Sequence, residues 1–392
     1  MPKNSYKFMI VAGEASGDLH AAKLVNAFRE SAPDASFEFF GAAGERMREA
    51  GVEAIVHADG LSVVGLPEIG RALPMFLRTF SALKNAAAVR KPDAVILVDF
   101  PDFNLKLARS LSKNGHRVIY YISPQLWAWR GYRIRTIRKY VELVISILPF
   151  EKAWYAEQGI TNVVYVGSPL AREVHPTQDR TEFTRLHGLD PNRPIVSLLP
   201  GSRHKEIVRI LPVMLDAVSR MSVVNTDLQF VIAIGSAKNL IDVRSAIDSA
   251  SARGISVKEN VIVVENETFN ALNASDAAAV TSGTATLETG IIGTPMAIVY
   301  KTSAFNYKLL RPLIDVEHFG LINLIADERV ARELIQDEFT AKSLSDELFR
   351  LLEPETNRLV REKLNAASDK LGHGGASGRA ALLILDRMSR NL

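Results

Sequence analysis

The sequence contains no cysteine among its 392 residues, which excludes disulfide bonds and thiolate metal sites. It also has no apolar run close to the roughly 18 residues that a membrane-spanning helix requires. The apolar run 8–12 is too short for the hydrophobic region of a signal peptide and leads directly into a polar loop. We therefore expect a cytoplasmic protein.

Acidic residues are missing from two long stretches of the first half. Residues 103–141 and 69–92 contain Lys and Arg but no Asp or Glu, and the second stretch adds an apolar stripe at helical spacing, made of Leu73, Met75, Phe76, Leu77, Phe80 and Leu83. Basic and apolar faces together suit an anionic membrane surface. The aromatic and glycine patterns of nucleic-acid modules are absent, so no nucleic-acid partner is expected. A packed amphipathic helix with solvated cations explains either stretch equally well.

Composition and length indicate a globular protein with two domains. Hydrophobic residues make up 47% of the chain and charged residues 23%. Apolar runs that alternate with helical patterns predict an α/β fold of two Rossmann-like, doubly wound domains that face each other across a cleft. The expected domains are 1–168 and 169–378. A last helix, 379–390, follows a glycine-rich joint at 373–378, and it could pack back on the first domain or exchange in a dimer.

The pattern also predicts the main elements. The expected strands are 7–12, 36–40, 94–98, 117–122, 143–148 and 163–166 in the first half, and 194–199, 228–234, 261–264, 276–280 and 296–300 in the second. The longer expected helices are 17–32, 103–114, 206–224, 331–352, 357–370 and 379–390.

Two loops of the second half are typical of phosphate binding. Ser282, Gly283 and Thr284 lie between a strand and a short helix, whose free N–H groups make an anion site. Glu288, one turn into this helix, suits the hydroxyl groups of a ribose and points to a nucleotide, although a capped helix with a solvated Glu remains open. Gly201, Ser202 and Arg203 follow another strand and form a second anion site. Two such sites fit a nucleoside diphosphate.

Several loops of the first half carry candidate catalytic groups. Glu14 follows the first strand and could orient a substrate or cap a helix; its loop lacks the G-x-G-x-x-G spacing of dinucleotide sites. Asp102 is a candidate general base, with N-capping of a helix that begins at Phe103 as the competing role. Trp127, Trp129 and Arg130 could stack on a sugar and hold a phosphate. No paired carboxylates at metal spacing stand beside the phosphate loops, so we expect no metal.

Taken in order, these motifs resemble the lipid-A-disaccharide synthase family. The segments that carry the resemblance are 12–18 (AGEASGD), 99–104 (DFPDFN), 123–130 (SPQLWAWR), 148–151 (LPFE), 199–203 (LPGSR) and 282–288 (SGTATLE). The last is shared more widely among two-domain (GT-B) glycosyltransferases, whereas the tryptophan segment is specific to the family.

The resemblance implies a cytoplasmic inverting transferase associated with the inner membrane, and we expect it to need no cofactor. It would move 2,3-diacylglucosamine from UDP-2,3-diacylglucosamine to 2,3-diacylglucosamine 1-phosphate, release UDP, and act as a homodimer. By motif, Glu14, Asp102, Arg203 and Asn323 match functional positions of the family. Lys301, Ala304 and Ile322 depart from its usual pattern near the uracil and diphosphate contacts. A UDP-N-acetylglucosamine epimerase, a peptidoglycan glycosyltransferase and a non-catalytic UDP-binding adaptor are the alternatives.

Overall fold

The computed structural model describes residues 4–58, 69–128, 131–255, 261–302 and 318–389, with side chains from residue 73 onward in the second range. Trp129, Arg130 and Ala304 therefore lie outside the described residues. The chain divides into two compact units, one formed by 1–169 with 374–392 and the other by 170–373.

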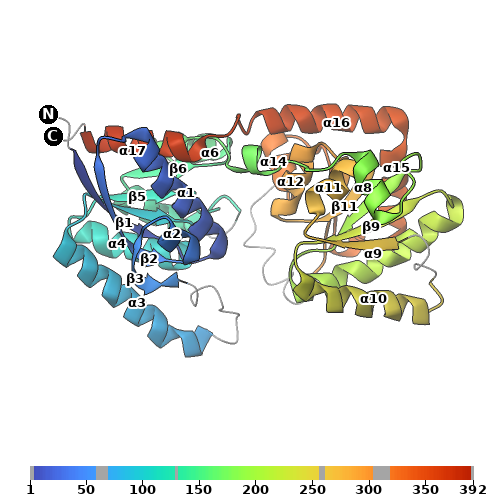
Figure 1. Cartoon of the computed structure of the whole chain (residues 1–392), viewed down its shortest axis with the longest axis horizontal. Helices are drawn as coiled ribbons and strands as arrows, with labels where there is room; N and C mark the ends of the chain where they lie inside the picture. The colour runs from blue at the N-terminus through green and yellow to red at the C-terminus, as the bar shows by residue number, and fades with distance from the viewer. Residues whose placement is uncertain (1–3, 59–68, 129–130, 256–260, 303–317, 390–392) are drawn as a thin grey trace. The chain divides into compact units, whose positions relative to one another are not determined.

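A seven-stranded parallel sheet forms the first unit, in the order β3-β2-β1-β4-β5-β6-β7. Figure 1 labels most of its strands and helices. Its strands are β1 (Ser5–Val11), β2 (Ser36–Ala43), β3 (Glu53–His57), β4 (Ala94–Val98), β5 (Val118–Tyr121), β6 (Leu143–Ser146) and β7 (Val163–Tyr165). The central strand β4 is buried along its whole length. A continuous apolar run is what a parallel strand needs when helices cover both faces of its sheet.

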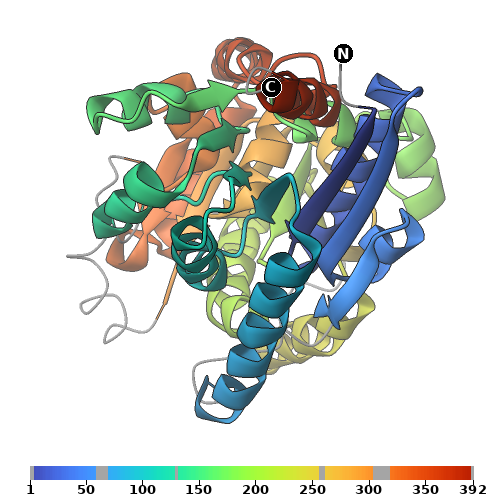
Figure 2. The ribbon, with the colours of Figure 1, turned by 90° about the vertical axis from the view of Figure 1, so that its left-hand side faces the viewer.

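Helices cover both faces of this sheet (Figure 2). One face is covered by α1 (Ala15–Ser31), α2 (Glu45–Glu49) and the C-terminal helix α17 (Ala376–Ser389). The other is covered by α3 (Ile69–Arg90), α4 (Pro101–Lys113), α5 (Ile134–Tyr140) and α6 (Glu151–Glu157). Within this chain, α17 packs against α1, and Arg379 donates a hydrogen bond to the carbonyl of Val166.

The second unit contains a six-stranded parallel sheet in the order β10-β9-β8-β11-β12-β13. Its strands are β8 (Ile195–Leu199), β9 (Gln229–Ile234), β10 (Val261–Glu265), β11 (Ala277–Thr281), β12 (Met296–Tyr300) and β13 (Arg332–Ile335). The α-helices that the structure describes in this unit are α7 (Leu170–Glu173), α8 (Arg180–His187), α9 (His204–Val224), α10 (Leu240–Ala252), α11 (Thr268–Ala274), α12 (Thr284–Ile292), α14 (Leu321–Ala326), α15 (Ala341–Leu352) and α16 (Pro354–Asp369).

The prediction of one helix over 331–352 is wrong. Residues Arg332–Ile335 instead form β13, which pairs with β12 at the edge of the sheet. The helix α15 begins only at Ala341, where the Thr340 side chain accepts a hydrogen bond from the N–H of Ser343. Strand pairing has overridden the helical spacing of a four-residue segment, as tertiary contacts often do.

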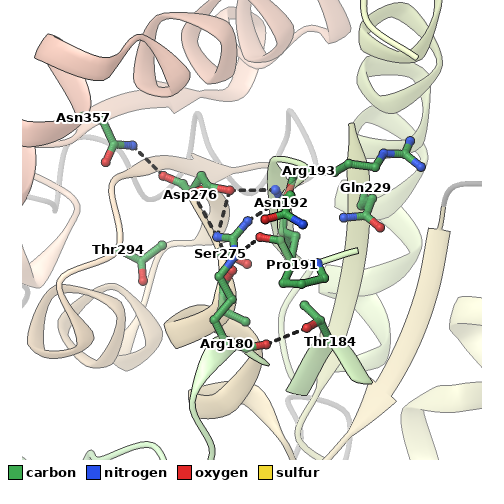
Figure 3. A network of polar contacts seen from close by, with 12 residues as sticks. Arg180, Thr184, Pro191, Asn192, Arg193, Gln229, Ser275, Asp276, Thr294 and Asn357 are labelled. Atoms are coloured by element: carbon green, nitrogen blue, oxygen red, sulfur yellow. Dashed lines mark hydrogen bonds and ion pairs between the residues drawn. The ribbon is translucent and has the colours of Figure 1, made fainter. Parts of the chain in front are cut away.

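A polar network fastens α8 and α16 to the amino ends of β8 and β11 (Figure 3). The Asp276 carboxylate accepts hydrogen bonds from Arg180 at 3.0 Å and from the N–H of Ile195 at 2.8 Å. The Asp276 carbonyl accepts a third from the side chain of Asn357 at 2.7 Å. Because the strands are parallel, this network lies at the sheet edge opposite the loops that follow β8 and β11, so its role is structural.

Cations of the acid-free stretches find partners elsewhere in the fold. Arg90 pairs with Glu53, and Arg117 pairs with Glu142 at 2.6 Å. These pairs show that a stretch without acidic residues in sequence does not have to be unpaired in space. Among the described residues, no helix combines the length and apolar character needed to cross a membrane.

The apolar stripe of α3 divides between core and surface. Phe76 packs against the rings of Phe100 and Phe103, and Leu83 is fully buried. Leu73 and Leu77 are 55% and 62% exposed. The stripe therefore serves as core at some positions and as an exposed apolar surface at others.

Candidate active site

In the first unit, the loops that follow β1, β4, β5 and β6 all reach the carboxyl edge of one parallel sheet. Glu14 stands at the N-cap position of α1, but its exposed side chain makes no capping hydrogen bond. The structure therefore does not use Glu14 as a side-chain cap, and its carboxylate remains available at this edge.

The loop after β4 has an unusual backbone. Asp99 and Phe100 both adopt left-handed conformations, with φ of 46° and 50°. Such conformations cost about 1–3 kcal/mol at each non-glycine residue and persist only where neighbours enforce them. Here the side-chain amide of Asn104 donates to the carbonyl of Asp99 at 2.8 Å, and the Tyr120 hydroxyl donates to the same carbonyl at 2.7 Å.

Asp99 is a titratable group of this edge that the sequence analysis missed. Burial and, to a smaller extent, the nearby charge of Glu14 raise the pKa of its carboxyl to about 6. A carboxyl that titrates near neutral pH beside a second carboxylate is typical of functional sites. Its position directly after a buried strand was the one available signal in the sequence.

The alternative role of Asp102 as a helix N-cap is wrong. The helix α4 begins at Pro101, Phe100 occupies the N-cap position, and no side chain caps the helix. Asp102 is the second helical residue, and 69% of its side chain is exposed. Its carboxylate accepts a hydrogen bond from the guanidinium of Arg133, which comes from the loop after β5. Asp102 is thus an accessible carboxylate in contact with a cation.

Trp127 lies in the loop after β5, and its ring is not exposed for stacking on a ligand. Only 7% of the residue is exposed, and its ring packs edge-on against Phe150 at 5.0 Å. Its indole N–H donates to the Oε1 atom of Glu151 at 3.1 Å. In this structure Trp127 therefore holds its loop to α6. The predicted partners Trp129 and Arg130 lie outside the described residues.

In the second unit, the turn at 282–284 leads directly into α12. Gly283 has φ of 152°, which side chains rarely tolerate, and α12 begins at the next residue, Thr284. The first N–H groups of this helix point out of the carboxyl edge of the sheet. The Ser282 hydroxyl fixes the turn by donating to the carbonyl of Phe319 at 2.9 Å.

Glu288 lies on the second turn of α12 and is partly buried. Burial raises the pKa of its carboxyl. No hydrogen bond joins it to the residues that the structure describes. A partly buried carboxylate near the N-terminus of a helix can accept hydrogen bonds from hydroxyl groups.

The turn at 201–203 precedes α9 and already contains a carboxylate. Oε2 of Glu206 accepts the backbone N–H groups of Ser202 at 3.1 Å and Arg203 at 3.2 Å. Oε1 accepts the Arg203 guanidinium at 3.1 Å. A side chain at Gly201 would come within 2.6 Å of this carboxylate, so the turn requires glycine there. The N–H groups and the guanidinium expected to bind phosphate are therefore present in this turn, and in the structure they bind Glu206.

Asn323 is placed differently from the other predicted catalytic residues. It is fully buried, exchanges hydrogen bonds with the backbone of Ala331, and donates to Glu333 at 2.9 Å. Glu333 also accepts the N–H groups of Phe319 and Gly320. Asn323 therefore shapes the 319–320 turn that Ser282 contacts. Its neighbour Ile322, a departure from the family pattern, is fully buried, and Lys301 is partly exposed.

Solved structures of other proteins share this fold. The structure resembles the UDP-GlcNAc 2-epimerase of Neisseria meningitidis bound to UDP-GlcNAc, with 13% identity, a TM-score of 0.62 and coverage of 97% of this chain and 99% of that one. It also resembles the calicheamicin glycosyltransferase CalG4, with 16% identity, a TM-score of 0.59 and coverage of 100% and 99%. These similarities establish a two-domain fold of the GT-B type.

Sequence comparison is more specific. The family model described as lipid-A-disaccharide synthetase matches residues 8–381. The lipid-A-disaccharide synthase of Syntrophus aciditrophicus is 41% identical over 389 residues, and that of Geobacter sulfurreducens is 40% identical over 390, each covering 99% of both chains. The chain therefore belongs to the lipid-A-disaccharide synthase family, the hexosyltransferases of lipid A synthesis.

Proposed function

We propose that this protein transfers 2,3-diacylglucosamine from UDP-2,3-diacylglucosamine to the 6-hydroxyl group of 2,3-diacylglucosamine 1-phosphate, with inversion at the anomeric carbon. The products are lipid A disaccharide 1-phosphate and UDP. The observation that carries this proposal is Asp102, an exposed carboxylate that is free of the capping role and pairs with Arg133. Membership of the family supplies the substrate class.

In the proposed reaction, Asp102 takes the proton of the acceptor 6-hydroxyl group as its oxygen attacks the anomeric carbon. The bond between that carbon and the phosphate oxygen of UDP breaks, and its electron pair leaves with the diphosphate. Arg133 holds the Asp102 carboxylate in place. Glu14 lies at the same sheet edge, and its role is to orient the acceptor.

The leaving diphosphate would be stabilised by the second unit. The N-terminus of α12, with Ser282, Gly283 and Thr284, contributes N–H groups, and the turn at 201–203 contributes the Arg203 guanidinium. Glu288 would accept hydrogen bonds from the ribose of UDP. Asn323 acts indirectly, through the 319–320 turn. No cofactor is part of this mechanism.

The donors of the 201–203 turn have to change partner during this reaction. Glu206 accepts both backbone N–H groups and the guanidinium in the structure. A diphosphate carries more negative charge than one carboxylate and can replace it at these donors. The movement of Glu206 would then free Arg203 for the leaving group.

We further propose that the protein binds the inner-membrane surface and acts as a homodimer. The exposed Leu73 and Leu77 of α3, in a stretch without acidic residues, support the membrane proposal. The glycine-rich segment before α17 gives the freedom that an exchanged C-terminal segment needs.

The test is to incubate the purified protein with both diacylated substrates and to measure product mass and UDP release. The proposed function predicts the disaccharide 1-phosphate and one UDP for each product molecule. Formation of an epimerised sugar from UDP-N-acetylglucosamine alone, without a disaccharide product, would instead indicate an epimerase. UDP binding without any turnover would indicate an adaptor.

A further inference from the structure

The segment 148–151 has no role in the reaction described above, yet its last residue is a buried acid. Glu151 is the first residue of α6 and is 1% exposed. Its Oε1 atom accepts the Trp127 indole N–H at 3.1 Å, whereas its Oε2 atom is buried with no hydrogen-bond partner among the described residues. A buried carboxyl in this setting requires an explanation.

Its contacts join two loops of the carboxyl edge. Trp127 lies in the loop after β5, and Glu151 follows β6, the neighbouring strand. A second hydrogen bond, between Ser123 and Tyr155 at 2.8 Å, joins the start of the same loop to α6. Both pairs are buried, so the loop after β5 is held to α6 at two points.

The same loop leads to the candidate general base. Beyond Trp127 the chain reaches Arg133, whose guanidinium contacts the Asp102 carboxylate. The side chain of Arg133 is only 14% exposed, so little freedom remains for it to adjust. Trp127 precedes Arg133 by six residues in the sequence, so the anchor at Trp127 lies close along the chain to the residue that contacts Asp102.

We propose that Glu151 is a positioning residue for the transfer reaction: through its hydrogen bond with Trp127, it fixes the loop that brings Arg133 to Asp102. This inference rests on the proposed function, in which Asp102 is the base. Glu151 touches no substrate in this scheme, and its contribution acts through Trp127.

The protonation state of Glu151 gives the inference a measurable signature. Burial raises the pKa of its carboxyl to about 8, although the hydrogen bond from Trp127 acts in the opposite direction. The titratable group of its own helix that faces it is Tyr155, whose pKa burial also raises, and no charged side chain among the described residues pairs with Glu151. With a pKa of about 8, Glu151 should be mainly protonated at pH 7 and should gain a buried negative charge in alkaline solution.

The test compares E151Q, E151L and W127F with the wild-type protein. E151Q keeps a neutral acceptor for the indole, E151L keeps most of the volume without the acceptor, and W127F keeps a ring without the donor. E157Q, on the exposed side of the same helix, is the matched control. The measurements are kcat and KM with the diacylated substrates, UDP affinity by calorimetry, and the indole N–H resonances of ¹⁵N-tryptophan-labelled protein.

We expect E151L and W127F to lower kcat at least tenfold while UDP affinity changes less than twofold. E151Q should recover most of the activity that E151L loses. The Trp127 indole resonance, assigned by its loss in W127F, should titrate in wild-type protein with a midpoint near pH 8 and stay constant in E151Q.

Wild-type kcat in folded W127F or E151L would overturn the inference, and so would an indole resonance that does not titrate. If E151L fails to fold, W127F carries the kinetic test. An inactive wild-type protein would refute the proposed function instead, while the titration of the resonance would still report the contact between Trp127 and Glu151.

Discussion

Arg203 and Glu206 form a closed pair at the start of α9. The Glu206 carboxylate binds both the guanidinium of Arg203 at 3.1 Å and its backbone N–H at 3.2 Å. The Arg203 side chain is nevertheless 83% exposed, whereas that of Glu206 is 21% exposed. The guanidinium is therefore free to exchange this internal carboxylate for an external anion, which is the property that a leaving-group stabiliser needs.

Replacing Arg203 by Ala should impair turnover without affecting the fold. The loss of one charge-assisted contact to a departing diphosphate costs about 3 kcal/mol, or roughly a hundredfold in kcat/KM. Steady-state kinetics would measure this change, and thermal unfolding would confirm that the variant folds. R220A, an exposed site at the far end of the same helix, is the control and should behave as wild type. Full activity of R203A would remove the 201–203 turn from the mechanism.

Replacing Glu206 by Gln should tighten UDP binding. The carboxylate competes with the diphosphate for the same donors, and removing one like charge at a partly exposed position is worth about 1 kcal/mol, or roughly fivefold in Kd. Calorimetric titration with UDP would measure the change. Weaker binding by E206Q would mean that Glu206 mainly orients Arg203 for the ligand, contrary to the competition proposed here.

Substitutions in α3 should distinguish exposed positions, which affect membrane binding, from packed positions, which affect stability. L77S changes a residue that is 62% exposed, so it should reduce co-sedimentation with anionic vesicles and leave the unfolding temperature nearly unchanged. F76S removes a ring that packs on Phe100 and Phe103, so it should lower stability by about 3 kcal/mol. Unchanged vesicle binding by folded L77S would argue against membrane contact through this helix.

Glu151 should also make stability depend on pH. Its pKa is raised from 4.5 to about 8 in the folded protein, so the folded state holds one more proton than the unfolded state between these values. The free energy of unfolding of the wild type should therefore fall as pH rises from about 5 to 8, by up to about 1.4 kcal/mol per pH unit. The Gln side chain of E151Q does not titrate. The free energy of unfolding of E151Q minus that of the wild type should therefore increase between pH 5 and 8 and level off above pH 8. Denaturant titrations at pH 5, 6, 7 and 8 would measure the difference, and parallel curves would contradict the assignment.

The sequence was sufficient for features that depend on local pattern. The apolar runs located the central strands of both sheets, and the Ser-Gly-Thr turn located the N-terminus of α12. Both signals depend on only a few neighbouring residues, namely the periodicity of hydrophobic side chains and the conformation of glycine. The edge strand β13 was not predicted, because residues Arg332–Ile335 are extended only through their pairing with β12.

Features that depend on contacts between distant segments could not be predicted in the same way. Trp127 appeared to be a stacking surface because nothing nearby in sequence shows that Glu151 binds its indole. A capping role for Asp102 was open because a helix was expected to begin at Phe103, whereas α4 begins at Pro101 and contains Asp102 in its first turn. Asp99 gained its raised pKa from burial and from Glu14, both of which only the folded sheet provides.

The most direct test of the account is turnover of the two diacylated substrates by the wild type and by D102N. We expect the wild type to form a disaccharide with inverted anomeric configuration, as measured by mass spectrometry and by the coupling constant of the new anomeric proton. Because Asn cannot accept a proton, D102N should be about 100- to 10,000-fold slower. Its stability and UDP affinity should be close to those of wild type, since Asp102 is exposed and caps no helix. Near-normal turnover by D102N, or no disaccharide from the wild type, would contradict the account.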